Sequence, residues 1–205
     1  MDARESLLRA AVAVFAETGS RGATTRRIAR TAGVNEVTLF RHFRSKDELL
    51  HAAFERFGER ATAYALPAVP RDPAAELLVW CRAHHRELHR HRALIRKLLG
   101  EYEEQPGHCA QGMEVSIRIA NDLTRYLDEI RRLGLAAGDW DARAATAMLM
   151  GTIFSDAMGR DTMPARYPYA ARTAVSKYVH LFCAAIGVRP PRPARPRASS
   201  RHDRS

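Results

Sequence analysis

The sequence predicts an all-α protein of about nine helices, with a small three-helix unit at the N-terminus and a larger helical bundle behind it. Three observations support this prediction. Apolar residues recur every three or four positions through most of the chain. No run of alternating, β-branched residues indicates a strand. Residues 24–48 combine two short helices, a glycine turn between them and a capped third helix.

The composition limits the classes of partner. The chain has 205 residues and is 46% apolar, which is enough to build a core in one or two domains. Its formal net charge of +10 favours an anionic partner. Half of this charge lies in residues 188–205, which hold six Lys/Arg and one acidic residue. This proline-rich segment is expected to be a disordered basic tail that either binds DNA weakly or only keeps the chain soluble.

Cysteine usage and hydropathy indicate the compartment. Cys81, Cys109 and Cys183 are odd in number and lack the spacing of a disulfide framework, so reduced thiols are expected. The N-terminus lacks the basic-then-apolar pattern of a signal peptide, and no apolar run approaches membrane-spanning length. We therefore expect a cytoplasmic protein with no membrane partner.

The first helix is expected over residues 4–18, where Leu7, Val14 and Phe15 share one face and Gly19 closes the helix.

The next segment has a residue suited to each structural role. Ala29 is small, so two helices can cross closely beside it. Gly33 can adopt a positive φ, which ends one helix and turns the chain. Asn35 is a good N-cap for the following helix. Ser45 and Glu48 have the spacing of a capping box for a third helix.

A long helix is expected from residue 46 onward. Prolines at positions 67, 70 and 73 interrupt the chain after it. Helices over residues 73–91, 92–103, 108–133, 141–159 and 168–187 are expected to follow. We divide the chain into a helix-turn-helix domain (1–50), a helical bundle (51–187) and the tail (188–205).

The N-terminal pattern resembles the TetR family of bacterial transcriptional regulators. The matching residues are Leu7 to Gly19, Ala23 to Thr25, Ile28 and Ala29, Ala32 to Val34, Thr38 to Phe40, His42 and Phe43, and Ser45 to Leu50. The likeness covers roughly the first quarter of the chain, with agreement at many spaced positions. It implies a homeodomain-like helix-turn-helix domain that binds double-stranded operator DNA. It also implies a C-terminal domain that binds a small effector and forms a homodimer.

The resemblance also implies which side chains contact DNA. The first motif helix contributes contacts to the backbone or a base edge, the second faces the major groove, and two positions contact phosphate. Carried onto this sequence, the set is Thr25, Arg26, Glu36, Val37, Thr38, Phe40, Arg41, His42 and Lys46.

Four of these positions have particular chemistry. Phe40 stands where the family usually has a tyrosine whose hydroxyl binds phosphate, so only packing against the DNA backbone remains. Val37 replaces a small residue or proline and can contact a thymine methyl. Glu36 either accepts a hydrogen bond from a cytosine amine or favours the helix N-terminus. Lys46 opposes the dipole in the first turn of its helix, so it either binds a phosphate there or is a lone solvated lysine.

The expected effector domain offers a candidate ligand set on apolar or mixed helix faces. Adaptable methionine and aromatic side chains suit an apolar or aromatic effector. The alternative, that these stripes are ordinary core packing, is favoured for any single residue. The candidate residues are Trp80, His84, Met113, Ile117 and Asn121.

A histidine-rich stretch was considered as a metal site. Cys81 and His85 are four residues apart, as are His85 and His89, so one helix face can offer two ligands. Arginines are interleaved and no second cluster completes a site, so we expect a solvated helix face and no metal. The chain has no nucleophile elbow, phosphate-binding glycine loop or HExxH motif, so we expect neither enzyme activity nor a cofactor.

Dimerisation is expected through the last two helices, at Leu149, Ile153, Val175, Phe182 and Ile186. Two DNA-reading helices on one two-fold axis require near-palindromic half-sites about one helical turn (roughly 34–36 Å) apart, or a multiple. The sequence thus predicts a ligand-controlled repressor. The alternative is a ligand-independent DNA-binding protein whose C-terminal domain only dimerises or binds another protein.

Overall fold

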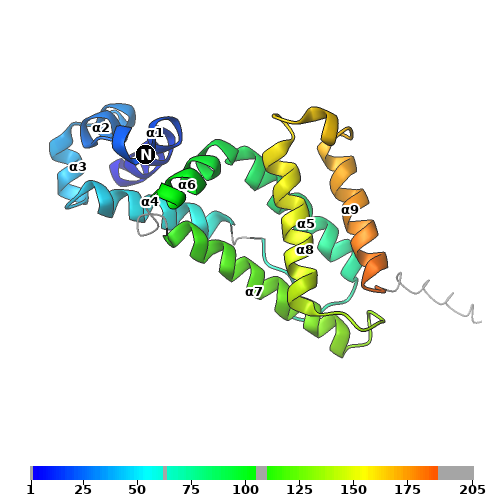
Figure 1. Cartoon of the computed structure of the whole chain (residues 1–205). Coiled ribbons are helices and arrows are strands. Elements are labelled where there is room, and N and C mark those ends of the chain that lie inside the picture. Colours follow the sequence, from blue (N-terminus) through cyan, green and yellow to red (C-terminus); the bar gives the residue numbers. More distant parts are fainter. Residues whose placement is uncertain (1, 62–63, 105–109, 189–205) are drawn as a thin grey trace, which may run out of the picture.

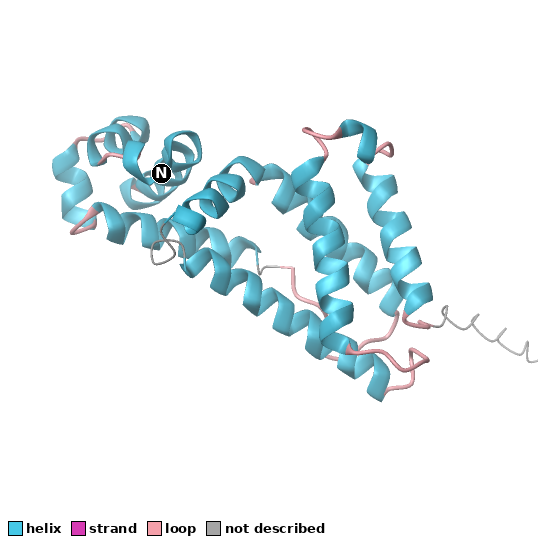
Figure 2. Ribbon diagram, in the orientation of Figure 1, coloured by secondary structure: helices cyan, strands magenta, loops and turns pink. Residues whose placement is uncertain are grey.

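The structure is a computed structural model that describes residues 2–61, 64–104 and 110–188. These ranges contain nine α-helices, a 3-10 turn at Pro164–Arg166 and one isolated β-bridge, between Ala136 and Val188. The predicted all-α class is confirmed (Figure 2). No helix in this part of the chain has both the length and the apolar character needed to cross a membrane. The predicted tail, apart from Val188, lies outside the described residues, as does Cys109.

Four helices form the N-terminal unit: α1 (Ala3–Gly22), α2 (Thr25–Ala32), α3 (Glu36–His42) and α4 (Lys46–Ala61). The regular part of α1 ends at Gly19, as predicted, and a short helical piece continues beyond this residue. Gly19 interrupts the helix with a φ of 69° and a ψ of −174°, and the chain continues to Gly22. The core of this unit is closed by buried side chains from all four helices, among them Leu7, Ile28, Leu39 and Leu49.

Five helices form the second unit: α5 (Pro73–Arg90), α6 (Arg92–Glu104), α7 (Ala110–Arg132), α8 (Ala142–Gly159) and α9 (Ala171–Ala185). Their bounds follow the predicted ranges, except that α9 begins three residues later than expected. The 3-10 turn and Pro168 lie in the segment before it, and the helix begins only after Ala170, whose ψ of 142° is not helical. The core of this unit joins α5, α7, α8 and α9 around Leu77, Leu127, Leu149 and Phe182.

A charged side chain lies inside this second core. Asp156 on α8 is 0% exposed. Its carboxylate accepts hydrogen bonds from His85 Nε2 at 2.6 Å, Arg160 Nη2 at 2.6 Å and Tyr178 Oη at 2.8 Å. Burial raises the pKa of the Asp156 carboxyl, but these hydrogen bonds outweigh burial and hold the pKa below its usual range. The three donors therefore satisfy a buried charge and connect α5, α8 and α9.

Two contacts join the N-terminal unit to the rest of the molecule. α6 packs against α1, and Leu94 of α6 belongs to the N-terminal core. α4 packs against α7 as it leaves the N-terminal unit (Figure 1). α3 lies at the end of the molecule remote from α8 and α9 (Figure 1).

Candidate nucleic-acid interface

The turn between α2 and α3 is built by local capping. The side chain of Thr24 accepts from the Arg27 N–H at 3.3 Å at the start of α2. Gly33 ends α2 in the left-handed region, with a φ of 72°. The side chain of Asn35 accepts from the Thr38 N–H at 2.7 Å and caps α3. The predicted helix-turn-helix and its N-cap are confirmed.

The start of α4 is fixed in the same way. The Ser45 hydroxyl accepts from the Glu48 N–H at 3.1 Å. The Glu48 carboxylate in turn accepts from the Arg44 N–H at 2.9 Å. The predicted capping box is therefore present, with its return hydrogen bond one residue earlier than the usual pattern.

α3 presents an exposed face that combines apolar and basic side chains. Val37 is 77% exposed and Phe40 is 52% exposed, whereas Leu39 between them is buried in the core. Arg41 on the same helix and Arg26 at the start of α2 are also exposed. Exposed large apolar side chains on a short, capped helix indicate a contact surface.

A hydrogen bond connects the two motif helices at this surface. The Thr25 hydroxyl, at the start of α2, donates to Glu36 Oε1 at 2.7 Å. It holds the Glu36 carboxylate between the first turns of α2 and α3. Both predicted roles of Glu36, at a cytosine amine and at the helix N-terminus, fit this position.

His42 and Lys46 are less open than the sequence suggested. Nε2 of His42 is shielded from solvent, and no described residue gives it a hydrogen bond. The Lys46 ammonium donates to the carbonyl oxygen of Ser20 at 3.0 Å, so this lysine is anchored to the end of α1. A phosphate contact by Lys46 stays a prediction. The hydrogen bond to Ser20 already holds the lysine side chain in one place.

The predicted effector residues differ in their surroundings, and none of them, within the described part of the chain, lines either of the two hollows reported below. Trp80 is buried in the second core, and the His84 ring stacks on it with centroids 3.9 Å apart. A His84 ring N–H donates to the Trp80 carbonyl at 3.0 Å. Ile117 and Asn121 are exposed on α7. The side chain of Met113 lies outside the described residues.

The histidine-rich face of α5 is not solvated as predicted. Cys81 is fully buried, His85 bonds to Asp156, and a His89 ring N–H donates to the Ala157 carbonyl at 3.3 Å. Burial lowers the pKa of His85, and its hydrogen bond to Asp156 offsets this only in part. Among the described residues, no three His, Cys, Asp or Glu side chains are grouped so that they could hold a metal ion.

The predicted dimer contacts need correction. Their side chains lie in the core of a single chain and are unavailable to a second copy, because apolar periodicity marks buried positions without telling which helix buries them. They are Leu149, Ile153, Val175, Phe182 and Ile186. The same two helices expose other apolar side chains, Met148 on α8 and Leu181 on α9.

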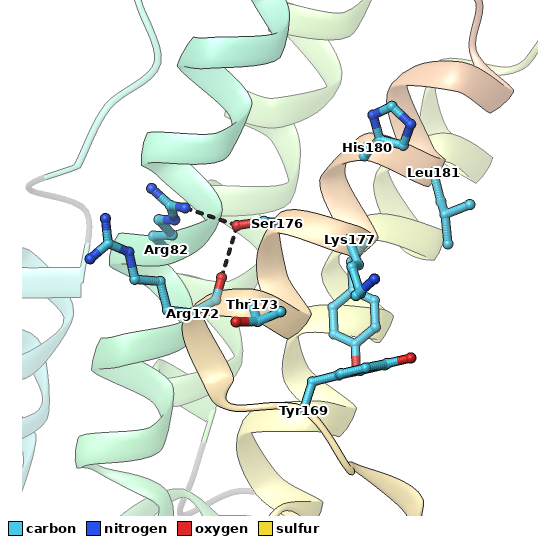
Figure 3. Close-up of a pocket in the computed structure, with 9 residues that line it drawn as sticks. Arg82, Tyr169, Arg172, Thr173, Ser176, Lys177, His180 and Leu181 are labelled. Atoms are coloured by element: carbon cyan, nitrogen blue, oxygen red, sulfur yellow. Dashed lines mark hydrogen bonds between the residues drawn. The ribbon is translucent and has the colours of Figure 1, made fainter.

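A groove of about 750 Å³ follows the outer face of α9. Figure 3 shows Arg82 and Arg172 on one side of α9 and Lys177 with Tyr169 on the other. Arg82 Nη2 donates to Ser176 Oγ at 2.8 Å, and the Lys177 ammonium lies 4.9 Å from the centre of the Tyr169 ring. No acidic side chain lines this groove. Sequence reasoning missed the surface, although Arg172 and Lys177 mark it as the polar face of a helix.

A second hollow, of about 370 Å³, lies where the two units meet. It is lined by α1, by Ala53 and Arg56 of α4, and by the junction of α5 and α6. An ion pair between Arg56 Nε and Glu5 Oε2, 3.6 Å apart, joins α4 to α1 at this cleft. Both hollows therefore lie outside the core of the second unit.

Comparison with known proteins gives matches to the segment that contains this helix-turn-helix. The family model of the bacterial regulatory proteins of the tetR family matches residues 7–53. The class D tetracycline repressor of Escherichia coli is 40% identical over 65 residues, which are 32% of this chain and 30% of that protein. An HTH-type transcriptional repressor of Mycobacterium tuberculosis is 35% identical over 98 residues, 47% of each chain. The chain thus spans less than half the length of these curated relatives.

A solved structure has the same fold as this chain. The regulator FadR of Bacillus subtilis, solved in complex with stearoyl-CoA, superposes with a TM-score of 0.66 at 22% identity. The alignment covers 89% of this chain and 98% of FadR. Residues 7–53 therefore match the N-terminal domain of the bacterial regulatory proteins of the tetR family, and the chain shares its fold with FadR.

Proposed function

We propose that this protein is a cytoplasmic transcriptional regulator that binds double-stranded DNA as a homodimer and acts as a repressor. The observation that carries the proposal is the outward face of α3, held by caps at both ends of the turn, with Val37 and Phe40 exposed beside Arg41. A short helix of this kind enters the major groove by its N-terminal end. The two relatives named as repressors support the direction of regulation. No catalytic activity is part of the proposal.

The DNA surface combines base reading with charge. In this proposal Val37 and Thr38 contact base edges, Phe40 packs on the sugar–phosphate backbone, and Arg26 and Lys46 contact phosphates. Only a few phosphate contacts are needed when apolar side chains supply part of the interface.

The homodimer is proposed to form through the outer faces of α8 and α9. Met148 is exposed on α8, Gly151 has open space around its Cα, and Leu181 and Ala184 are exposed on α9. Small side chains allow close approach of helices, and a two-fold axis lets one apolar patch cover its own copy. The α9 groove in Figure 3 flanks this patch, so a second copy would cover part of it.

The repressor is proposed to be released by a small apolar or aromatic effector. FadR, which has the same fold, was solved with stearoyl-CoA, and this supports an effector with a long apolar part. One observation favours the ligand-independent alternative: Trp80 packs in the core while Ile117 and Asn121 face outward. Adding stearoyl-CoA to the protein–DNA complex distinguishes the effector model from the ligand-independent alternative. Release of DNA supports the effector model. Stearoyl-CoA must then bind the free protein more tightly than the protein–DNA complex, by the same factor by which it weakens DNA binding.

The test of DNA binding is selection from a random duplex library with the full-length protein. We expect the enriched sequences to contain two inverted half-sites whose centres are about one helical turn apart. If no sequence were enriched, or if the enriched sequences shared only one asymmetric site, DNA binding by a symmetric dimer would be refuted.

A further inference from the structure

The kink in α1 is held from both sides by charged groups. Gly19 has a positive φ, and the next residue, Ser20, has an N–H that donates to Glu101 Oε1 on α6 at 2.6 Å. The carbonyl oxygen of the same Ser20 accepts from Lys46 Nζ, at the start of α4, at 3.0 Å. All three residues are partly buried. A single residue of α1 thus connects α6 with the lysine proposed to contact phosphate.

Close packing of α6 on this kink depends on the absence of a side chain at Gly19. A Cβ placed there would overlap the Glu101 carboxylate and would lie 2.6 Å from Cε of Lys97. Both of these side chains come from α6. A side chain at Gly19 would push the flexible ends of Glu101 and Lys97 aside, whereas the positive φ is what requires glycine itself.

The hydrogen bonds around Ser20 are of the strong kind. Gly19 leaves the helical conformation immediately before Ser20, and a partly buried N–H at such a break needs an acceptor. The Glu101 carboxylate supplies that acceptor from a position 81 residues away in the sequence. A carboxylate on the N–H and an ammonium on the carbonyl are both charge-assisted contacts, and they fix the same residue.

We propose that Glu101 is a positioning residue for the DNA contact of Lys46, acting through the backbone of Ser20. This inference rests on the proposed DNA binding. The Lys46 ammonium has three protons, of which one is directed at Ser20, so two remain for a phosphate. A lysine that is already held loses less side-chain entropy when the phosphate binds. Displacement of α6 would release Ser20 and weaken the Lys46 contact, which makes Glu101 a point where α6 acts on the DNA surface.

The test measures the affinity of the full-length protein for a duplex selected from random DNA, over a series of salt concentrations. Log affinity falls as log salt rises, and Lys46→Ala should make this slope less steep by about one. Glu101→Ala should make the slope less steep by at least about half of that amount. It should also lower the affinity about three- to tenfold. The double variant should be no weaker than Lys46→Ala alone, because both changes remove one contact.

Two controls separate positioning from a general loss of stability. Glu101→Gln keeps an oxygen that accepts from the Ser20 N–H, and it should restore most of the affinity and slope. Glu114→Ala removes an exposed carboxylate from α7 and should behave as the unchanged protein. Thermal melting of each variant shows whether it is folded.

A normal salt slope in Glu101→Ala, or additive losses in the double variant, would overturn the proposal while DNA binding itself stands. An unchanged slope in Lys46→Ala would overturn it as well. If the unaltered protein enriches no duplex, the proposed function fails first, and this inference fails with it.

Discussion

At the scale of single residues, the proposed DNA surface combines two exposed apolar side chains on one short helix. Val37 and Phe40 have more than half of their surface in water, although they flank the fully buried Leu39. Their exposure contributes nothing to folding, so their side chains are available for recognition. A valine methyl can pack on a thymine methyl, and a phenylalanine ring can pack on a deoxyribose.

Val37→Ala should therefore change base preference without changing stability. We expect the free energy of unfolding to stay within about 0.5 kcal/mol, because the side chain is 77% exposed. Selection from random DNA should show weaker preference for thymine at one position of each half-site. Val79→Ala, on α5 and 68% exposed, is the matched control and should leave the selected sequences unchanged. Identical base frequencies for Val37→Ala would refute its contact with a base.

At the scale of helices, the ends of the motif helices are specified locally and were predictable. Caps and turns depend on residues within four positions of one another, so Gly33, Asn35 and the Ser45–Glu48 pair could be located from the sequence. The anchoring of Lys46 by Ser20 joins residues 26 positions apart, and that of Ser20 by Glu101 joins residues 81 apart. Such contacts depend on how α1, α4 and α6 pack, which no local pattern contains.

The turn between α2 and α3 gives a stability prediction. Gly33→Ala should destabilise the protein by about 1–2 kcal/mol, because an alanine Cβ is strained at a φ of 72° although no atom blocks it. Gly100→Ala, in the middle of α6 with open space around it, should instead stabilise by about 0.5–1 kcal/mol. Chemical denaturation measures both changes. Equal effects of the two substitutions would contradict the left-handed turn.

The buried carboxylate of α8 gives a second prediction at this scale. Asp156→Asn removes the charge that Arg160, His85 and Tyr178 surround, and it should destabilise by about 3–5 kcal/mol. Asp128→Asn, in an exposed ion pair on α7, should cost no more than about 1 kcal/mol. If denaturation gave similar losses for the two variants, the cluster would not hold α5, α8 and α9 together.

At the scale of the whole molecule, sequence periodicity identified the helices but not their partners. Leu149 and Phe182 were predicted at the dimer interface because they lie on strongly apolar faces, and those faces bury each other within one chain. The faces left for a second copy are weaker patterns of small and apolar residues on α8 and α9. Ile117 on α7 shows the same limit: its stripe is apolar, yet its own side chain is 57% exposed.

Leu181→Glu should separate the proposed dimer. Leu181 is 66% exposed in one chain, so the fold should tolerate the change. At a two-fold interface the substitution brings a carboxylate from each copy into apolar contact, which favours monomers. Sedimentation should show the monomer mass, and operator affinity should fall at least tenfold because one half-site is lost. Val79→Glu on α5 is the matched control, and a dimeric Leu181→Glu would place the interface elsewhere.

The central claim is that two copies of α3, fixed on one two-fold axis, read two half-sites on one face of the DNA. It is tested most directly by inserting about five base pairs, half a helical turn, between the half-sites of the selected duplex. Fluorescence anisotropy then compares the affinity of the full-length protein for the original and the lengthened duplex. We predict a loss of at least tenfold, because the second half-site turns to the opposite face. Equal affinity for both duplexes would contradict the claim.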